Sequence, residues 1–459
     1  MGWQNAPWRA VSRSVTLAGS ADVGEVAADM GTGGPEAELS TFNPFHPATL
    51  QCPFPQYARM RSEAPVLHLP ALGMYLVTRH DLVLQVLRDT ATFSSKFVVT
   101  SALGDPEARK RLMDVFEQGY PRVPTMLTVD QPEHTRYRSL VARAFHPRAI
   151  AELEPAIRSI AARLIDSWID RGSVEFVEDF AVPLPVEVIA RALNVPDSRL
   201  ADFKRWSDDS VAGIGTNVSI DERVRAEMGV NEFQRYFAEQ IEMRRSEPQD
   251  DLLTNLLNAR IDDDAGAGEV SDRRPLDMPE MLSIVQQLLV AGNETTTKML
   301  TEMMRLLGEH PEQWRLLKGD PSRIERIVEE TLRLSTPTQG MFRVVTADTE
   351  LGGVPLPKGA RIVVVFSSAN RDERLYPEPD AFDPDREHLR DHLAFGKGIH
   401  FCIGANLSRL EGKVALEELL KRIDSFALAS SNSFEYFPSF ILRGLTRLDL
   451  DVVPERPPA

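Results

Sequence analysis

The sequence predicts a mainly helical protein with a small β portion, an α+β fold organised as one large domain. Long segments carry apolar residues at helical spacing, whereas strand-like segments are short and lie toward the two ends of the folded body. The 459 residues would allow about three domains by length alone. No stretch rich in Pro and Gly separates two lobes, so we expect one domain that holds a helix-rich and a strand-rich region.

The longest predicted helix covers residues 279–308. Its residues are apolar on more than one side, so we expect it to run through the core. The proline at its start falls in the first turn, where the missing N–H group is tolerated. Apolar residues at the same spacing predict further helices over 152–171 and 185–194, and another helix is predicted over 405–420.

Short apolar and β-branched runs predict strands. These runs cover residues 66–69, 74–77, 342–346, 361–366 and 448–453. Because the runs are few and short, we expect small sheets that accompany a helical body.

Composition excludes several function classes. The formal net charge is −16 and the sequence holds no run of Lys and Arg, so we expect no nucleic-acid partner. The two cysteines, Cys52 and Cys402, are far apart, which excludes a disulfide scaffold and favours a reducing, cytoplasmic location. No apolar run reaches the roughly 20 residues of a membrane-spanning helix, so we expect no membrane anchor.

The beginning of the chain differs from the rest. Residues 1–41 are rich in Gly, Ala, Ser and Glu without sustained periodicity, and we predict a flexible extension there. No apolar run of signal-peptide length follows the early arginines. We expect residues 42–459 to form the folded domain, and we expect a monomer.

The segment 395–404, Phe-Gly-Lys-Gly-Ile-His-Phe-Cys-Ile-Gly, holds three glycines around Cys402. Such glycines favour a tight turn in which the backbone approaches a large flat object closely. Because a helix is predicted to begin at residue 405, its dipole and free N–H groups favour the thiolate form of Cys402. A thiolate in this position is a nucleophile or a metal ligand, and a buried structural cysteine is the alternative.

Zinc is a second interpretation of the same region, because His388, His392, His400 and Cys402 lie close in sequence. However, a single residue separates His400 from Cys402, and no second cysteine or Cys-x-x-Cys pair is nearby. Zinc therefore stays the runner-up.

Four motifs follow one another along the chain. They are Ala291-Gly292-Asn293-Glu294-Thr295-Thr296, Glu330-Thr331-Leu332-Arg333, Phe382-Asp383-Pro384-Asp385-Arg386, and the pattern Phe-x-x-Gly-x-His-x-Cys-x-Gly of residues 395–404. In this order they resemble the motifs of the cytochrome P450 family, and the resemblance extends over about residues 42–455. It implies the P450 fold, with a long central helix over haem b, and a soluble bacterial-type haem-thiolate monooxygenase.

The resemblance makes Cys402 the axial ligand of the haem iron, to which its thiolate supplies electron density. Phe395, Gly396 and Gly404 then shield and tune the sulfur. Haem also carries two propionates that need cationic or hydrogen-bonding partners. The family resemblance assigns this contact to His134, Arg138, Arg343 and His400.

A structural ion pair is expected from the second and third motifs. Glu330 and Arg333 are one helical turn apart and can pair with each other, and Arg386 joins them from the third motif. Their expected role is to hold the cysteine loop rather than to contact oxygen.

The oxygen chemistry is expected on the long helix. Gly292, beside Ala291, weakens the helix and leaves a groove for O2, and the Thr295 hydroxyl can bond back to a carbonyl and widen the bend. Glu294 supplies the acid of an acid–alcohol pair and is the expected proton source.

The resemblance implies that one oxygen atom of O2 enters the substrate and that electrons come from a separate ferredoxin-type protein. A basic docking face is expected for that donor, formed by Arg136, Arg143, Arg148, Lys397 and Lys413. Two alternatives are a peroxide-driven enzyme of the same fold and a non-catalytic haem-binding or sensor protein. The intact acid–alcohol pair argues against both.

A substrate pocket is expected beside the long helix, with a mainly apolar lining that suits a hydrophobic small molecule such as a terpenoid, steroid, fatty acid or aromatic compound. The residues assigned to it are Gln287, Val290, Ala291, Met341, Phe440 and Ile441. Gln287 is either a polar anchor for the substrate or a partner of a neighbouring helix.

Overall fold

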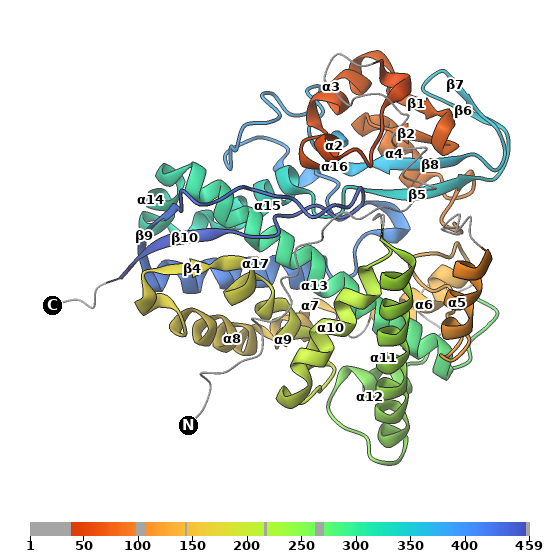
Figure 1. Ribbon diagram of the computed structural model, residues 1–459, viewed down its shortest axis with the longest axis horizontal. Coiled ribbons are helices and arrows are strands. Elements are labelled where there is room, and N and C mark those ends of the chain that lie inside the picture. The colour runs from red at the N-terminus through yellow and green to blue at the C-terminus, as the bar shows by residue number, and fades with distance from the viewer. Residues whose placement is uncertain (1–37, 98–105, 143–144, 215–217, 262–269, 456–459) are drawn as a thin grey trace.

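The computed structural model describes residues 38–97, 106–142, 145–214, 218–261 and 270–455, and helices dominate this part of the chain (Figure 1). The α-helices are α2 (Pro47–Gln51), α3 (Phe54–Glu63), α4 (His80–Arg88), α5 (Pro106–Phe116), α6 (Glu133–Ala142), α7 (Pro147–Ala151), α8 (Glu154–Asp166), α9 (Pro183–Ala192), α10 (Leu200–Val211), α11 (Ile220–Ser246), α12 (Leu252–Asn258), α13 (Met278–Glu309), α14 (Pro311–Gly319), α15 (Ile324–Ser335), α16 (Phe366–Ala369) and α17 (Ala405–Arg422).

The strands form small sheets at two ends of the molecule. The larger sheet has the order β1-β2-β8-β5-β3 and lies beside α3, α4 and α16 (Figure 1). A three-stranded sheet, β4-β10-β9, lies near α14 and α8, and β6 pairs with β7. The bounds are β1 (Val66–Leu69), β2 (Met74–Val77), β3 (Phe93–Ser94), β4 (Ser173–Glu175), β5 (Gly340–Val345), β6 (Thr349–Leu351), β7 (Val354–Leu356), β8 (Arg361–Val365), β9 (Ile423–Leu428) and β10 (Asp449–Pro454).

The mainly helical fold class is confirmed, and each predicted strand is present within two residues of its expected bounds. The sequence analysis missed β3, β4, β6, β7 and β9. The sequence did contain a signal for the hairpin of β6 and β7, namely the pair Gly352-Gly353. These two residues form its turn, with φ values of 58° and 82°. The other missed strands are short or half-exposed, so they lack a strong apolar run.

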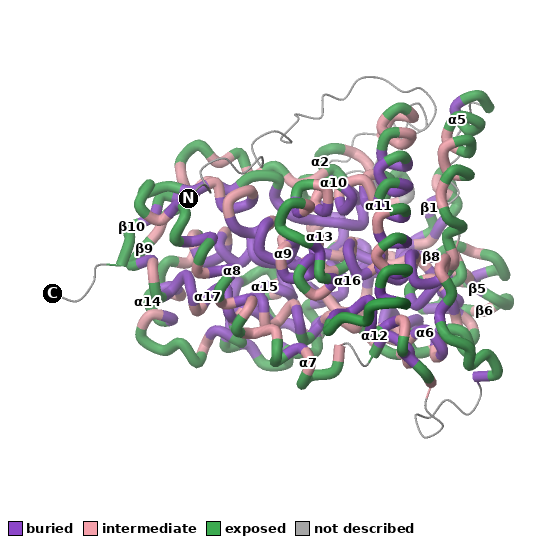
Figure 2. The backbone as a smooth tube through the Cα atoms, turned by 90° about the horizontal axis from the view of Figure 1, so that it is seen from below, coloured by how far each residue is buried: buried purple, intermediate pink, exposed green. Residues whose placement is uncertain are grey.

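Helix α13 is the predicted central helix, and its 32 residues pass through the buried middle of the molecule (Figure 2). It begins with a capping box, in which the Asp277 carboxylate accepts from the Glu280 N–H at 3.0 Å and the Glu280 carboxylate accepts from the Asp277 N–H at 2.9 Å. Neither α13 nor another helix in the described ranges combines the length and the apolar character needed to cross a bilayer.

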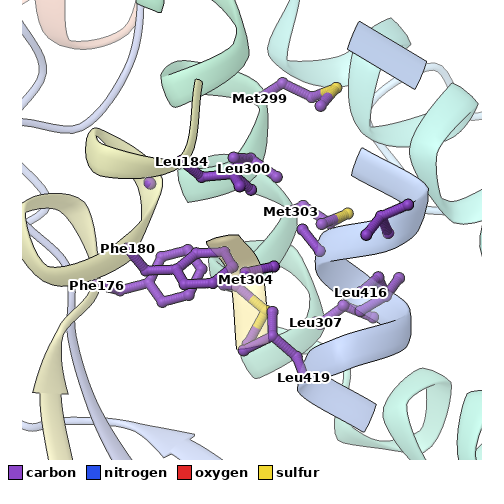
Figure 3. Close-up of a cluster of buried hydrophobic side chains, with 14 of the residues drawn as sticks. Phe176, Phe180, Leu184, Met299, Leu300, Met303, Met304, Leu307, Leu416 and Leu419 are labelled. Carbon is purple, nitrogen blue, oxygen red and sulfur yellow. The ribbon is translucent and has the colours of Figure 1, made fainter. Parts of the chain in front are cut away.

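The second half of α13 is fixed by apolar packing on two sides. Phe176 and Phe180 approach it from the segment before α9, and Leu416 approaches it from α17, as Figure 3 shows. Met303 and Met304 of α13 lie between these neighbours and are fully buried. This packing holds α13 and α17 together, and α17 follows directly after the cysteine loop.

The described part of the chain begins at residue 38, before the predicted boundary at residue 42. Residues 1–37 lie outside the described part of the chain, but Leu39–Thr41 form a 3₁₀ helix. Leu39 packs against a core cluster that includes Phe42 and Tyr57. Leu39 thus contributes an apolar side chain to the packing of the folded domain.

Candidate functional site

The cysteine loop is a compact turn held by its own backbone. The Cys402 N–H donates to the Phe395 carbonyl at 2.9 Å, which closes the loop. Gly396 and Gly398 adopt φ values of 66° and 73°, in a backbone region that residues other than glycine rarely adopt. A Cβ atom on Gly398 would lie 2.7 Å from the Leu87 carbonyl oxygen of α4, so this glycine also permits a close backbone approach.

Cys402 lies just before α17, as predicted, with Gly404 at the N-cap position. Burial raises the pKa of the Cys402 thiol above its ordinary value, while the backbone N–H groups of Gly404 and Ala405 act in the opposite direction. The expected effect of the helix N-terminus on the thiol is therefore present, but in the protein alone it is smaller than the effect of burial.

Glu330 lies between two arginines, in the arrangement that the motifs predicted. The Arg333 guanidinium donates to the Glu330 carboxylate at 2.7 and 2.8 Å, and Arg386 Nε donates to it at 3.3 Å. The side chains of Glu330 and Arg333 are fully buried. Arg333 also donates to the carbonyls of Pro379 and Ala381, so the ion pair ties α15 to the segment that leads into the cysteine loop.

A second buried ion network escaped the sequence analysis. Glu329, next to Glu330, accepts from Arg409 of α17 at 2.5 and 3.0 Å, and it lies 2.9 Å from His392 Nε2. The Arg409 guanidinium also stacks over the Phe395 ring at 4.6 Å. The expected shielding residue Phe395 is therefore itself fixed from α17. Glu329 has no motif of its own, so no spacing signal could have selected it.

Basic side chains from three elements converge near the loop. His134 and Arg138 come from α6, Arg343 from β5, and His400 from the cysteine loop. The rings of His134 and His400 are 4.4 Å apart at an angle of 63°. His400 Nε2 is 2.9 Å from the Ser95 hydroxyl, whereas the buried His134 Nε2 has no hydrogen-bond partner.

The Asp130 carboxylate acts electrostatically on Arg343, His134 and His400, but within the described residues it forms no ion pair with them and accepts instead from the Ser94 hydroxyl and the Ser95 N–H. Neither Arg138 nor Arg343 forms an ion pair within the residues that the structure describes, and burial lowers the pKa of Arg343 to about 10. Burial, followed by the charge of Arg138, lowers the pKa of His134 to about 4. Burial and the neighbouring His134 lower the pKa of His400 to about 3, so both histidines are neutral near pH 7. This set of groups can hold a buried anion.

The middle of α13 is unusually accessible for a core helix. Ala291 is exposed and Gly292 is half-buried, although Leu288, Leu289 and Thr296 around them are buried. Helix α13 continues through Gly292, where the sequence analysis expected a weakened helix with a groove for O2. The expected back-bond is present: the Thr295 hydroxyl donates to the Ala291 carbonyl at 2.8 Å.

Glu294 of α13 is paired with a lysine. It forms an ion pair with Lys298 at 2.6 Å, one turn further along α13. Burial raises the pKa of Glu294, but Lys298 and Lys204 outweigh it and the net direction is downward. The ion pair and the direction of this pKa shift favour the ionised form of Glu294, which the sequence analysis expected to be the proton source.

Comparison with known proteins identifies the family of this arrangement. A profile described as cytochrome P450 matches residues 324–432. Cytochrome P450 109 of Bacillus spizizenii is 35% identical over 404 residues, which are 87% of this chain and 92% of that protein. The erythromycin C-12 hydroxylase of Saccharopolyspora erythraea is 38% identical over 368 residues, which are 79% of this chain and 85% of that protein. This chain belongs to the cytochrome P450 family.

A solved structure shows the same fold for this P450. Cytochrome P450 CYP109Q5 from Chondromyces apiculatus has a TM-score of 0.78 at 36% identity and covers 91% of this chain and 100% of that chain. The protein is thus a P450 monooxygenase of the haem-thiolate class and binds haem b. The site fits this cofactor, because Cys402 lies within electrostatic reach of Arg138. Arg138 belongs to a group with His134, Arg343 and His400, which we call the anion cradle, and the buried His134 Nε2 in it has no hydrogen-bond partner among the described residues.

The expected pocket residues of the P450 lie in different environments. The Gln287 side chain donates a hydrogen bond to the Thr125 hydroxyl, in the loop before α6, so its partner is a loop and not a helix. Val290 packs at the edge of the cluster that holds Phe440 and Ile441, which are buried. Met341 is half-buried at the edge of another cluster.

The expected docking face needs correction. Arg136 is buried and pairs with Glu280 of α13 at 2.8 Å, so it cannot contact a partner protein. Arg143 lies outside the described residues. Arg148 and Lys413 are 87% and 40% exposed at their side chains, and Lys397 is half-buried in the cysteine loop. Arg136 and Arg138 are two residues apart on α6 and so lie on different helix faces, a signal that the sequence did contain.

The zinc interpretation has no support in the geometry. His392 bonds to Glu329, His388 lies 3.1 Å from Asp391, and His400 bonds to Ser95. Within the described part of the chain, no group of three or more His, Cys, Asp or Glu side chains is arranged to hold a metal ion.

Proposed function

We propose that this P450 oxidises a small hydrophobic organic substrate with O2, that Cys402 is the iron ligand, and that a separate ferredoxin-type protein supplies the electrons. The observation that carries the proposal is the anion cradle beside the cysteine loop. Within the described residues His134, Arg138 and Arg343 form no ion pair with a protein carboxylate, although Asp130 acts electrostatically on His134 and Arg343. Basic and hydrogen-bonding groups in this state suit the two propionates of haem.

Bound haem supplies the redox chemistry by which O2 is activated. The protein residues around the haem bind it, orient it and protect it. Cys402 offers its sulfur from a loop that α17 and the Phe395–Arg409 stack hold in place. Arg343 and Arg138 offer charge to the propionates, and the neutral His134 offers its unpaired Nε2 atom. Ala291 and Gly292 keep side chains away from the middle of α13, which leaves room for O2.

Thr295 has the hydroxyl group that we assign to proton handling. In this structure its proton is donated to the Ala291 carbonyl at 2.8 Å. The hydroxyl can instead turn toward the haem side and hold a proton there, because it is half-buried and has no second acceptor within the described contacts. A Thr295→Val substitution removes this group with little change of volume.

The substrate class follows from the surroundings of α13. Val290, Met341, Phe440 and Ile441 are apolar, and Gln287 is already bonded to Thr125. An apolar lining with few polar anchors selects hydrophobic ligands. The relative from Saccharopolyspora erythraea is named erythromycin C-12 hydroxylase.

The electron donor is expected at the surface near Cys402. Phe401, next to the cysteine, is 37% exposed. Of the residues expected to form the basic docking face, Arg148, Lys397 and Lys413 are still available at the surface. An acidic donor would be attracted to these cations even though the whole chain has a net charge of −16.

The first experiment is the absorbance spectrum of the purified protein, reduced and then exposed to carbon monoxide. A strongly red-shifted Soret band is expected for thiolate ligation, and Cys402→His should shift the band to the position of histidine-ligated haem. A wild-type band already at that position would overturn the role of Cys402. The same band can then be used to screen hydrophobic compounds. A compound that displaces water from the haem changes the spin state of the iron and thereby shifts the band. Product formation with a ferredoxin, its reductase and NADPH tests the electron donor.

A further inference from the structure

Arg409 of α17 is held by a carboxylate at its edge and by an aromatic ring at its face. Its Nε atom donates to Glu329 Oε1 at 2.5 Å, and its Nη2 atom donates to Glu329 Oε2 at 3.0 Å. The centre of the guanidinium lies 4.6 Å from the centre of the Phe395 ring. Because two parallel hydrogen bonds and a stacked ring fix a planar group, the positive charge of Arg409 has a defined place against Phe395.

The carboxylate that holds Arg409 stays ionised in the interior. Glu329 is 3% exposed and lies 2.9 Å from His392 Nε2. His392 Nδ1 accepts from the Ala394 N–H at 3.2 Å, so the ring proton is on Nε2 and is donated to Glu329. Burial alone would raise the pKa of Glu329, but the bonds from His392 and Arg409 outweigh it and lower the pKa to about 2. Arg409 and Glu329 are therefore both charged near pH 7.

The cation of this pair contacts the turn that carries Cys402. The Cys402 N–H donates to the Phe395 carbonyl at 2.9 Å, so the Phe395 ring and the sulfur belong to one closed turn. Arg409 covers that ring and acts electrostatically on Cys402, as Arg138 does from α6. Glu329 belongs to α15 and binds the edge of the guanidinium. The pair thus presents its positive member to the cysteine loop.

A fixed charge beside this loop has a definite effect on a bound haem. A thiolate ligand donates electron density to the iron, and a cation near the sulfur reduces that donation. The same cation favours the ferrous over the ferric iron, because it attracts the added electron. Glu329 has the opposite sign and limits both effects.

We propose that the Arg409–Glu329 pair sets the reduction potential of the haem iron through Cys402. Arg409 is a positioning residue that places a cation against the turn of the ligand, and Glu329 holds this cation and limits its charge. The proposal rests on the function proposed above, because it requires Cys402 as the iron ligand. It concerns the single electron that passes from the ferredoxin-type donor to the iron, so no further reactant is involved.

The decisive experiment is a redox titration of the haem-loaded protein with small-molecule mediators. Arg409→Gln removes the cation and should lower the reduction potential, whereas Glu329→Gln removes the anion and should raise it. We expect each substitution to shift the equilibrium between ferrous and ferric haem by about tenfold, which is about 59 mV for one electron. A role confined to stability would not produce shifts of opposite sign.

Three further variants separate charge from packing. The double variant with Arg409→Gln and Glu329→Gln removes both charges and should return the potential close to that of the wild type. Arg409→Lys keeps the charge without the planar fork and should shift the potential less than Arg409→Gln. Lys421→Gln is the matched control on α17, because Lys421 is 58% exposed at its side chain and pairs with Glu418 at 2.6 Å. Its potential should equal that of the wild type.

A second measurement tests whether the effect passes through the sulfur. The infrared stretching frequency of carbon monoxide on the reduced haem falls when the thiolate donates more electron density to the iron. It should therefore fall in Arg409→Gln and rise in Glu329→Gln. A shifted potential with an unchanged stretching frequency would overturn the route through Cys402. Potentials that stay unchanged, or that move in the same direction in both variants, would overturn the proposal as a whole.

Failure of the proposed function would be visible separately. A wild-type protein without the strongly red-shifted Soret band lacks Cys402 as a thiolate ligand, whereas the proposal on Arg409 fails only where that band is present and the potentials do not respond. If Glu329→Gln does not fold, Arg409→Met and Arg409→Lys keep the test, because the two side chains differ mainly in charge. The potential must then fall in Arg409→Met by more than in Arg409→Lys, and equal potentials would overturn the proposal.

Discussion

Arg333 donates to both carboxylate oxygens of Glu330, at 2.7 and 2.8 Å, and the side chains of both residues are fully buried. The same carboxylate accepts from Arg386 and from the Asp383 N–H at 3.0 Å. Arg333 also donates to the Asn370 carbonyl at 2.9 Å. Because the buried charges of this ion pair have partners on all sides, it fixes the chain between residues 370 and 386 to α15.

Removal of one partner from this ion pair should cost much stability. Arg333→Ala leaves Glu330 buried with a weaker partner, and we expect the free energy of unfolding to fall by about 3–5 kcal/mol. Chemical denaturation followed by tryptophan fluorescence measures this change. Arg390→Ala is the matched control, since Arg390 pairs with Glu325 at 3.3 Å on the surface and should change stability by less than about 1 kcal/mol. Equal effects of the two substitutions would contradict the structural role.

The residues of the anion cradle should contribute unequally to the binding of haem. Arg343 brings a buried positive charge, whereas His134 is neutral near pH 7 because burial and then Arg138 lower its pKa to about 4. Loss of a charged hydrogen bond costs about 1.5–3 kcal/mol. We therefore expect Arg343→Met to speed haem dissociation by roughly 10- to 100-fold, and His134→Phe to have a smaller effect.

Transfer of haem to an excess of a haem-scavenging protein measures these dissociation rates. Arg361→Met is the control, because Arg361 lies on the neighbouring strand β8 but is exposed and donates to the Leu72 carbonyl at 3.3 Å. A dissociation rate in Arg343→Met no faster than in this control would remove Arg343 from the haem site.

Glu411 should make the stability of the protein depend on pH. It is buried on α17, with the Thr296 hydroxyl as a neighbour and no ion pair to a cation among the described residues, and burial raises its pKa from 4.5 to about 8. Between these values the folded protein holds a proton that the unfolded chain has released. Stability from this group is therefore fully present below about pH 4.5 and is lost as pH rises toward 8.

The slope expected for one proton is about 1.4 kcal/mol per pH unit at most. Glu411→Gln keeps the neutral shape and should remove this slope. Unfolding measured at pH 5, 6 and 7 for both proteins compares them, and the stability of the variant relative to the wild type should increase with each step. Parallel curves would show that Glu411 is not neutral in the folded protein.

The sequence was sufficient for features that depend on spacing along one helix or on a fixed motif. The central helix, the Glu330–Arg333 pair and the helix after Cys402 were predicted because each depends on residues close in sequence. The bond from Thr295 to Ala291 is local in the same way.

Features that depend on tertiary neighbours were missed or mistaken. Arg136 was assigned to the surface, but Glu280 lies 144 residues further along and binds it in the core. Glu329 gains His392 and Arg409 from two other segments. The pairing of Glu294 with Lys298 is the exception, because their spacing of four residues was visible in the sequence and favours an ion pair on one helix face.

The docking of the electron donor should respond to charge at Arg148 and Lys413. Both side chains are exposed, and each pairs only loosely with a glutamate on its own helix or beside it, at 3.5 and 4.0 Å. If an acidic ferredoxin binds near Cys402, Arg148→Glu combined with Lys413→Glu should reverse the local attraction and lower the rate of association by about tenfold or more at low salt.

Stopped-flow reduction of the haem by the reduced ferredoxin measures this rate. The effect should shrink as ionic strength rises, because exposed charges are screened within about 10 Å at 0.1 M salt. A double variant on another surface, Arg235→Glu with Arg245→Glu on α11, changes the net charge equally and is the control. If both double variants slow reduction to the same extent, only the net charge matters and the donor does not bind at the surface near Cys402.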